Sequence, residues 1–181
     1  MAMVDDAEER RLKVLQSFKI LDTPHEERFD RLVRMATRIF GSPIALISLV
    51  DRDRQWFKAA VGIDATETPR AVSFCAHAIK QRGVFVVADA QGDERFATNP
   101  LVTGDPNIRF YAGAPLVTSD GEALGTVCVI DQNPWFDFPE YAKDVLQDYA
   151  GVVTDWLESD RKVRLLEEEN ARLKAELAAK K

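Results

Sequence analysis

The stretch from Arg109 to Asp131, RFYAGAPLVTSDGEALGTVCVID, consists of two apolar segments separated by a short polar turn. Asp120-Gly121 lies in that turn, and Asp-Gly between apolar segments is a strong hairpin signal because glycine adopts positive φ angles at no steric cost. Both segments are apolar at successive positions, which a strand tolerates only where both faces of its sheet are covered. The sequence therefore predicts a central β-hairpin rather than an edge hairpin.

Three residues are expected to interrupt the regular pairing of this hairpin. Gly113 and Gly125 lie inside the strands, where glycine usually marks a bulge or a close approach to the backbone. Pro115 has no N–H group to donate, so we expect a local break in the ladder beside it.

Length and composition limit the classes of protein that fit. At 181 residues the chain accommodates one domain plus an appendage. No segment approaches the ~20 apolar residues of a membrane helix, and the acidic start does not resemble a signal peptide. The net charge of −6 disfavours nucleic acid and anionic membranes as partners. Two cysteines, Cys75 and Cys128, fit a reducing compartment, so we expect a cytoplasmic protein.

Before the hairpin, the patterns alternate between helix and strand. Apolar residues at helical spacing predict an amphipathic helix from about Asp6 to Leu21. Thr23-Pro24-His25-Glu26 reads as a capping box for a second helix that ends at Gly41. Strands are expected at 44–50, 55–61 and 84–88, with a loop at 62–73, a short helix from Ser73 to about Lys80, and an aperiodic but apolar-anchored cover at 89–107.

Long strings of this sequence resemble the GAF domain, in particular the bacterial subgroup found ahead of histidine kinases and diguanylate cyclases. They include LDTPHEERFDRLVRMATRIFGSPIALISLVDRDRQWFKAAVG, SFCAHAI, VVADAQGDERFATNPLVTG and the hairpin itself. The resemblance implies an α+β fold with a central antiparallel sheet of five to six strands and helices on its faces. It also implies a sensory and dimerisation role, without naming a ligand.

The carboxyl-terminal region predicts one long helix that begins near Asp137-Phe138-Pro139-Glu140 and continues as a parallel coiled coil. A heptad register places at its a and d positions Tyr149, Val152, Trp156, Ser159, Val163, Leu166, Asn170, Leu173 and Leu177. A single Asn at an a position is a known device for fixing a parallel two-stranded register. We therefore expect a parallel homodimer, in which Lys162 faces Glu167 and Glu169 faces Lys174 of the second copy.

These patterns divide the chain into three parts. Residues 1–22 form an amino-terminal amphipathic helix expected to join the dimer bundle, residues 23–158 form the GAF domain, and residues 159–181 form the coiled-coil signalling helix.

Candidate ligand-binding residues come from the short helix, the cover and the hairpin. They are Phe74, Cys75, His77, Asp89, Arg95, Phe96, Asn99, Arg109, Tyr111 and Cys128. Arg95 or Arg109 suits either a structural clasp or an anion contact, and the sequence does not say which strand face lines the pocket. Cys75 and His77 are two apart on a helix and point in different directions, so no metal site is expected. The sequence does not identify a cofactor.

The leading interpretation is a small-molecule sensor in bacterial signal transduction, such as a two-component system, that relays its pocket state to an output kinase or cyclase. After the GAF-like region the sequence has no phosphoacceptor histidine, no kinase ATP-binding block and no Gly-Gly-Glu-Glu-Phe string, so we expect no enzymatic activity. Two alternatives remain open. One is a free methionine sulfoxide reductase that uses Cys75 or Cys128, and the other is a purely structural dimerisation domain.

Overall fold

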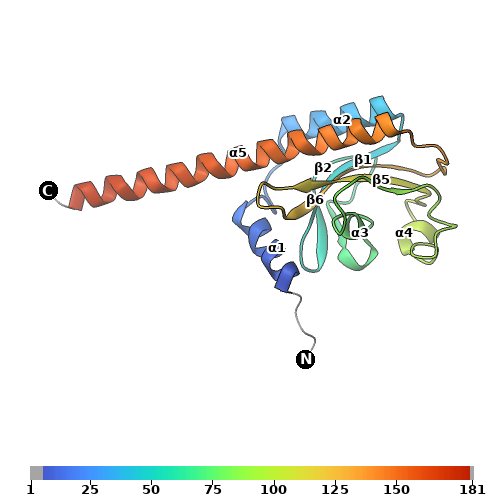
Figure 1. The fold of residues 1–181 in the computed structure, drawn as a ribbon, viewed down its shortest axis with the longest axis horizontal. Coiled ribbons are helices and arrows are strands. Elements are labelled where there is room, and N and C mark those ends of the chain that lie inside the picture. The colour runs from blue at the N-terminus through green and yellow to red at the C-terminus, as the bar shows by residue number, and fades with distance from the viewer. Residues whose placement is uncertain (1–5, 180–181) are drawn as a thin grey trace.

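The computed structural model describes residues 6–179 and shows an α+β fold built on one six-stranded antiparallel sheet (Figure 1). The strand order is β3-β2-β1-β6-β5-β4. The strands are β1 (Ile44–Val50), β2 (Arg54–Val61), β3 (Glu67–Pro69), β4 (Phe85–Val87), β5 (Phe110–Val117) and β6 (Ala123–Asp131). The helices are α1 (Asp6–Ser17), α2 (Glu27–Phe40), the 3-10 turn η1 (Arg70–Val72), α3 (Cys75–Ala78), α4 (Pro100–Thr103) and α5 (Glu140–Ala179).

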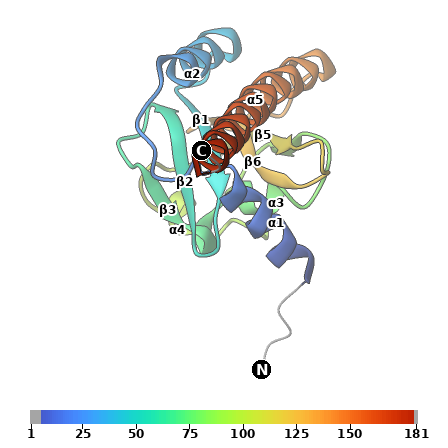
Figure 2. The same ribbon diagram turned by 90° about the vertical axis from the view of Figure 1, so that its left-hand side faces the viewer.

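Helices cover both faces of the sheet, as the apolar strands require. Helices α2 and α5 lie on one face, and α3 and α4 lie on the other (Figures 1 and 2). Alternate residues of β1 enter separate cores: Ala45 and Ile47 pack toward α2 and α5, whereas Ile44 and Leu46 pack toward α3. Strand β1 is buried along its whole length.

The hairpin of β5 and β6 has the central position that its sequence predicts. Gly121 in its turn has a φ of +84°. The pairing register shifts between Pro115 and Val117, which confirms the expected break. At Gly125 an added Cβ would lie 1.9 Å from the Ser48 carbonyl oxygen of the neighbouring strand. Glycine is required there because two backbones approach each other closely.

The start of α2 differs from the predicted capping box. The helix begins at Glu27, and no side chain caps it. The Thr23 hydroxyl donates to the Ile20 carbonyl oxygen and accepts from Lys58 Nζ, while the Glu26 carboxylate pairs with the same lysine. Because buried Lys58 binds the Thr23 hydroxyl and the Glu26 carboxylate, these two groups do not form the expected capping box. The predicted end of α2 is confirmed, because Gly41 adopts the left-handed conformation with a φ of +68°.

Short elements occur where the sequence predicts only loops. Strand β3 and η1 lie within the expected 62–73 loop, and α4 lies within the 89–107 cover. The short helix after Ser73 is present as α3, and the Ser73 hydroxyl accepts from the Ala76 amide at 3.0 Å. Elements of three or four residues are too short to produce a periodic pattern, and tertiary pairing defines them.

Helix α5 is one continuous helix of 40 residues that leaves the body of the domain (Figure 1). Its buried residues all lie in the first half: Ala142, Leu146, Ala150, Val153, Thr154 and Leu157. Beyond Leu157 the helix has no buried residue among those described, up to Ala179.

Candidate functional site

A closed pocket lies between the sheet and the cover formed by α3 and the segment around α4. Its lining combines the inner face of the sheet with that cover: Ile44, Leu46, Gln55, Phe57, Ile63, Thr68, Phe74, Cys75, Leu101, Pro106, Ile108, Tyr111 and Ile130. The cavity volume is about 20 Å³, which is room for about one water molecule. Because Tyr111 points into this pocket, the Tyr111 face of β5 is the pocket face and the Phe110 face packs toward α2 and α5.

Phe74 and Tyr111 line the pocket, and further aromatic rings pack against Phe74. The rings of Phe74 and Phe96 stack with centroids 4.1 Å apart and planes 9° apart. Phe74 also stacks on Tyr111 at 5.3 Å, and His77 meets Phe96 edge-on at 4.9 Å. Such ring pairs stabilise by about 0.5–1.5 kcal/mol beyond their burial. A ligand larger than water enters only if side chains of the lining move.

A buried polar network lies beside the aromatic stack. The Gln55 side-chain oxygen accepts from the Ser73 hydroxyl at 2.6 Å and from the Ser48 hydroxyl at 3.3 Å. Its amide nitrogen donates to the Thr68 hydroxyl at 2.6 Å. These groups join β1, β2, β3 and the start of α3, so a ligand that bonds to Gln55 would rearrange contacts across four elements.

The two cysteines lie in one buried cluster, and Cys75 also lines the pocket. Both are free thiols and both are buried. Tyr111 Oη donates to Cys75 Sγ at 3.4 Å. Hydrogen bonding by Cys128, opposed by burial and helped by Thr126 and Tyr111, lowers the pKa of Cys75 to about 6. Burial raises the pKa of Cys128 well above its usual range. The sequence offers no sign of this lowered pKa, since no cation neighbours either thiol; the donors come from other strands.

Burial also raises the pKa of Tyr111 well above its ordinary value. The pocket therefore holds a neutral phenol, and of the two thiols the one at Cys75 ionises first. The pKa of His77 is lowered, chiefly by burial and then by Lys80 and Arg95, so its imidazole is neutral at physiological pH.

The other predicted site residues make structural contacts around the pocket. Arg95 pairs with Asp93 at 2.5 Å and lies over the rings of Phe85 and Phe96, so its guanidinium group makes structural contacts within the cover. Arg109 donates to the Val102 carbonyl oxygen at 2.9 Å.

Asn99 and Asp89 organise the cover itself. The Asn99 side chain accepts from the Leu101 amide at the start of α4 and donates to the Val72 carbonyl oxygen. Asp89 accepts from the Gln91 amide in a turn. Neither residue lies among those that line the cavity.

Sequence reasoning missed the polar floor of the pocket. Gln55, Ser48 and Thr126 are buried polar residues inside the strands β2, β1 and β6. A polar residue within a buried strand is a usable signal, because such a group needs a hydrogen-bond partner. Thr68 and Ile63 give no such signal, since they lie in a segment without periodicity.

A second concave surface lies between α2 and α5, on the opposite face of the sheet. This α2–α5 groove has a volume of about 330 Å³ and is lined by Arg28, Arg31, Leu32, Met35, Asp148, Tyr149, Val152 and Trp156. Among residues 6–179, every exposed large apolar side chain lies on α2, on α5 or just before α5: Met35, Ile39, Phe136, Tyr141, Val152, Val163, Leu165, Leu166, Leu173 and Leu177. Exposed apolar side chains gathered in this way mark an interaction surface.

Residues 6–179 contain no cluster of three or more side chains that could hold a metal ion. None of the described helices is long and apolar enough to cross a membrane.

The antiparallel sheet, the covered pocket on one face and the long exit helix on the other define an α+β domain of the sensory type. The chain belongs to the GAF domain family, whose model matches residues 24–154.

Comparison with known proteins gives one strong sequence relative. The chain is 44% identical over 161 residues to a cyclic di-GMP phosphodiesterase of Pseudomonas aeruginosa. The alignment covers 89% of this chain and 27% of that protein, so the chain spans about a quarter of its relative.

Solved structures share the fold at low sequence identity. The GAF domain of an Acinetobacter phosphoenolpyruvate-protein phosphotransferase superposes with a TM-score of 0.64 at 17% identity, over 88% of this chain and 98% of that one. Free methionine-R-sulfoxide reductase from Neisseria meningitidis gives 0.62 at 18% identity, over 90% and 96% of the two chains. These likenesses establish the fold alone.

The comparisons contradict the expectation that the protein has no enzymatic activity. The relative at 44% identity is named as a phosphodiesterase, and the structural neighbours include reductases from Neisseria meningitidis and Thermoplasma acidophilum. The expectation rested on the lack of kinase and cyclase motifs, and those motifs identify only these two classes of enzyme.

Proposed function

We propose that this chain is the sensory and dimerisation domain of a bacterial signalling protein, and that it relays the state of its pocket through α5 to an output domain or partner. One observation carries the proposal: α5 is buried in its first half and continues beyond the domain with exposed apolar residues at heptad spacing. A helix of that kind needs a partner, and it links the body of the domain to whatever follows.

The sequence relative supports an output in cyclic di-GMP signalling. The chain corresponds to about a quarter of a protein named as a cyclic di-GMP phosphodiesterase. We propose that the domain belongs to the bacterial sensory GAF subgroup found in histidine kinases and diguanylate cyclases. A bacterial cytoplasmic location is the matching expectation.

We propose a second copy of this chain as the partner of α5 and of the α2–α5 groove. The seam residues Val152, Val163, Leu166 and Leu173 are at least two-fifths exposed. The groove continues this seam onto α2 through Met35. Its two rims carry opposite charges, Arg31 on α2 and Asp148 on α5, which a two-fold related copy can pair.

Helix α2, in place of the amino-terminal helix, is the element we assign to the dimer bundle. The apolar residues Leu12, Leu15 and Phe18 of the amino-terminal segment are at most 5% exposed and are buried within their own chain. In contrast, Met35 and Ile39 of α2 are 45% and 56% exposed. A bundle of α2 and α5 from two copies would cover them.

The mechanism we propose is a shift between a closed and an occupied pocket. In the closed state the ring of Phe74 lines the pocket and stacks on Phe96. A ligand that displaces these rings moves the start of α3, which Ser73 ties to Gln55. Ligand binding then favours one arrangement of the exit helices over another in proportion to its difference in affinity for the two states.

The volume of the pocket favours a second candidate, a purely structural dimerisation domain. A cavity of about 20 Å³ is what a domain filled by its own side chains would show. The two candidates differ in one respect, because only a sensor binds a small molecule in this pocket.

Ligand retention and thermal shift separate the two candidates. Native mass spectrometry of the purified protein, followed by a thermal-shift screen of small metabolites, is expected to give at least one compound that raises Tm. Gln55→Leu should abolish that shift, because the buried amide is the polar anchor of the pocket. Gln91→Leu, at an exposed position outside the pocket, should retain it. A screen without any shift, or an equal shift in Gln55→Leu, would instead support the structural domain.

A further inference from the structure

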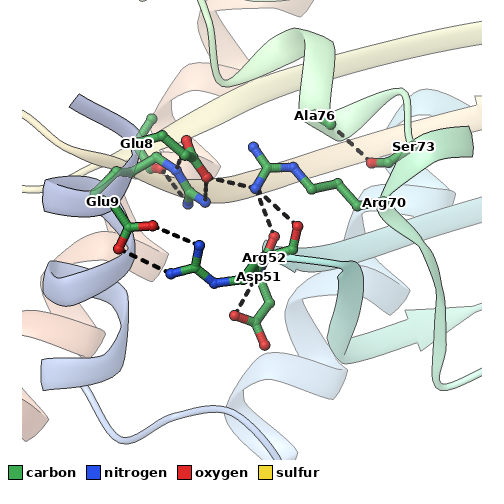
Figure 3. Close-up of polar contacts among 9 residues, drawn as sticks. Glu8, Glu9, Asp51, Arg52, Arg70, Ser73 and Ala76 are labelled. Carbon is green, nitrogen blue, oxygen red and sulfur yellow. Dashed lines mark hydrogen bonds and ion pairs between the residues drawn. The ribbon is translucent and has the colours of Figure 1, made fainter. Parts of the chain in front are cut away.

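Helix α1 is fastened at its amino-terminal end to the segment that leads into the pocket wall (Figure 3). The Glu8 carboxylate accepts from Arg70 Nη1 at 2.6 Å, and Glu9 receives two hydrogen bonds from Arg52 at 2.6 and 3.0 Å. Arg70 also donates to the Asp51 carbonyl oxygen at 2.9 Å. We call these contacts of Glu8 and Glu9 the acidic clasp.

The acidic clasp lies close to the pocket along the chain. Arg70 is the first residue of η1, which runs directly into Ser73. The Ser73 hydroxyl accepts from the Ala76 amide at the start of α3 (Figure 3). It also donates to the Gln55 side-chain oxygen in the pocket. Phe74, the ring in the centre of the aromatic stack, is the next residue. A movement of the pocket wall therefore moves the partners of Glu8.

The other end of α1 is fastened to α5. Arg164 of α5 donates to the carbonyl oxygens of Ser17 and Phe18, which are otherwise open acceptors at the end of the helix. The Arg161 guanidinium lies 4.9 Å from the centre of the Phe18 ring, and Lys19 pairs with Glu168 at 3.0 Å. These residues of α5 lie at the point where it leaves the domain, and we call residues 161–168 the exit segment of α5.

The middle of α1 is packed tightly enough to move as one piece. Leu12 and Leu15 are 1% and 0% exposed. Buried Arg11 bonds to Glu8 through Nε and Nη2, and to the Ala123 carbonyl oxygen of β6 through Nη1. Twelve helical residues span about 18 Å. No other element of the described chain contacts both η1 through an ion pair and the exit segment of α5 through a helix cap.

We propose that α1 is a brace that couples the pocket wall to the exit segment of α5. The inference deepens the proposed function and rests on it, since it names the element through which the pocket would act on the output helix. In this arrangement, breaking the contacts at one end of α1 makes local opening at its other end easier. The effect acts in both directions, because coupling between two sites is reciprocal.

Thiol reactivity of Cys75 measures this coupling without a ligand. Cys75 is buried in the pocket wall, so its rate of alkylation, resolved by mass spectrometry of the full chain's peptides, reports opening of that wall. Arg164→Gln removes the helix cap from the fastening on α5, and it leaves the Arg161–Phe18 and Lys19–Glu168 contacts in place. We expect it to accelerate alkylation of Cys75 roughly twofold or more, although Arg164 touches neither the pocket nor the acidic clasp.

Two controls make the result decisive. Arg172→Gln lies on the exposed part of α5, where Arg172 pairs within residues 6–179 with Glu169 and Glu176, and it should leave the rate at the wild-type value. Hydrogen exchange of the β6 amides in the same samples reports global unfolding and should also be unchanged. The coupling is also tested from the other end of α1. Arg70→Gln breaks the ion pair with Glu8 and should accelerate amide hydrogen exchange in residues 161–168.

The brace is overturned if Arg164→Gln leaves the Cys75 rate unchanged, or if that rate rises only in step with β6 exchange. Neither result depends on a ligand or on a second copy. Failure of the brace is therefore distinguishable from failure of the sensory or dimer proposals, which the ligand screen and the crosslinking experiment test.

Discussion

Gly125 of β6 lies close to the backbone of β1. A Cβ atom at this position would be 1.9 Å from the Ser48 carbonyl oxygen and 2.8 Å from Leu49 Cα. Both are backbone atoms in the middle of the sheet, so neither can move away without breaking the pairing. Gly151 is the natural contrast, because a Cβ there meets nothing within 4 Å and the residue lies inside α5.

Alanine at these two glycines should change stability in opposite directions. Gly125→Ala is expected to lower the free energy of unfolding by about 1–3 kcal/mol through overpacking. Gly151→Ala is expected to raise it by about 0.5–1 kcal/mol, because alanine is the better helix former. Urea unfolding of both variants beside the wild type measures the difference, and equal effects would show that the strands separate more easily than their geometry implies.

Glu8 makes the stability of the fold depend on pH. Hydrogen bonds from Arg11, opposed by burial and joined by Arg70, lower the pKa of Glu8 from 4.5 to about 2. A lowered folded-state pKa gives stability that is fully present above the unfolded value near 4.5 and is lost as the pH falls toward 2.

Glu8→Gln should therefore flatten the fall in stability between about pH 4.5 and pH 2. Chemical unfolding at several pH values in this window measures the slope. Glu94→Gln is the matched control, since Glu94 is exposed and has no ion pair in the described residues, and it should keep the wild-type slope. A Glu8→Gln curve that parallels the wild type would show that Glu8 is solvated in solution.

The sequence reveals some of these residues and hides others for a physical reason. Gly113, Gly125 and Pro115 are visible because their backbone chemistry differs from that of other residues. The lowered pKa of Cys75 and the pairing of Glu8 with Arg70 are not visible, because their partners lie on distant parts of the chain.

A β-bulge in β2 determines how α2 begins. The register between β1 and β2 shifts between Ile47 and Ser48, where Ala59 and Phe57 are the successive partners and Lys58 is the extra residue. A bulge redirects a side chain out of the normal alternation. Lys58 is 1% exposed and bonds to the Glu26 carboxylate, the Thr23 hydroxyl and the Pro24 carbonyl oxygen.

Replacing Glu26 should lower the free energy of unfolding more than replacing its partner Lys58. Glu26→Gln leaves a buried ammonium group without its counter-charge, so we expect a loss of about 1–3 kcal/mol. Lys58→Met leaves Glu26, whose side chain is 38% exposed, in contact with water, and should cost less. Thermal unfolding of both variants tests this order, and a larger loss for Lys58→Met would contradict it.

Long periodic elements were predictable, whereas short ones were not. Helix α2, strand β1 and the β5–β6 hairpin follow from spacing and turn residues. Strand β3 pairs only three residues with β2, and α4 is a single turn held by the Asn99 cap. The small pocket is equally hidden, since a sequence does not say that Phe74 and Phe96 stack on each other.

Asn170 should set the register of the proposed dimer. Its side chain donates to the Leu166 carbonyl oxygen of its own helix, and its exposed position leaves it free to meet its copy. Asn170→Leu is expected to raise Tm while broadening the oligomer distribution, because burial is gained and the polar contact at the seam is lost. Analytical ultracentrifugation with thermal unfolding measures both, and a lower Tm with an unchanged dimer would contradict the assigned seam.

The central claim is that two copies associate in parallel along α5, with α2 and α5 of each copy in one bundle. The exposed apolar residues of the described chain lie on α2, at Met35 and Ile39, just before α5, at Phe136, and along α5, from Tyr141 to Leu177. In a parallel pair each Leu177 meets its own copy, whereas in an antiparallel pair it lies near the domain of the other chain.

Oxidative crosslinking of a cysteine at the end of the seam tests this claim most directly. Leu177→Cys should form a disulfide-linked dimer at micromolar concentration, while Ala175→Cys, which the heptad places on the opposite side of the helix, should remain largely monomeric on a denaturing gel. The native thiols are both buried and serve as the unchanged background. Absence of crosslinking at position 177, or equal crosslinking at positions 175 and 177, would contradict the parallel dimer.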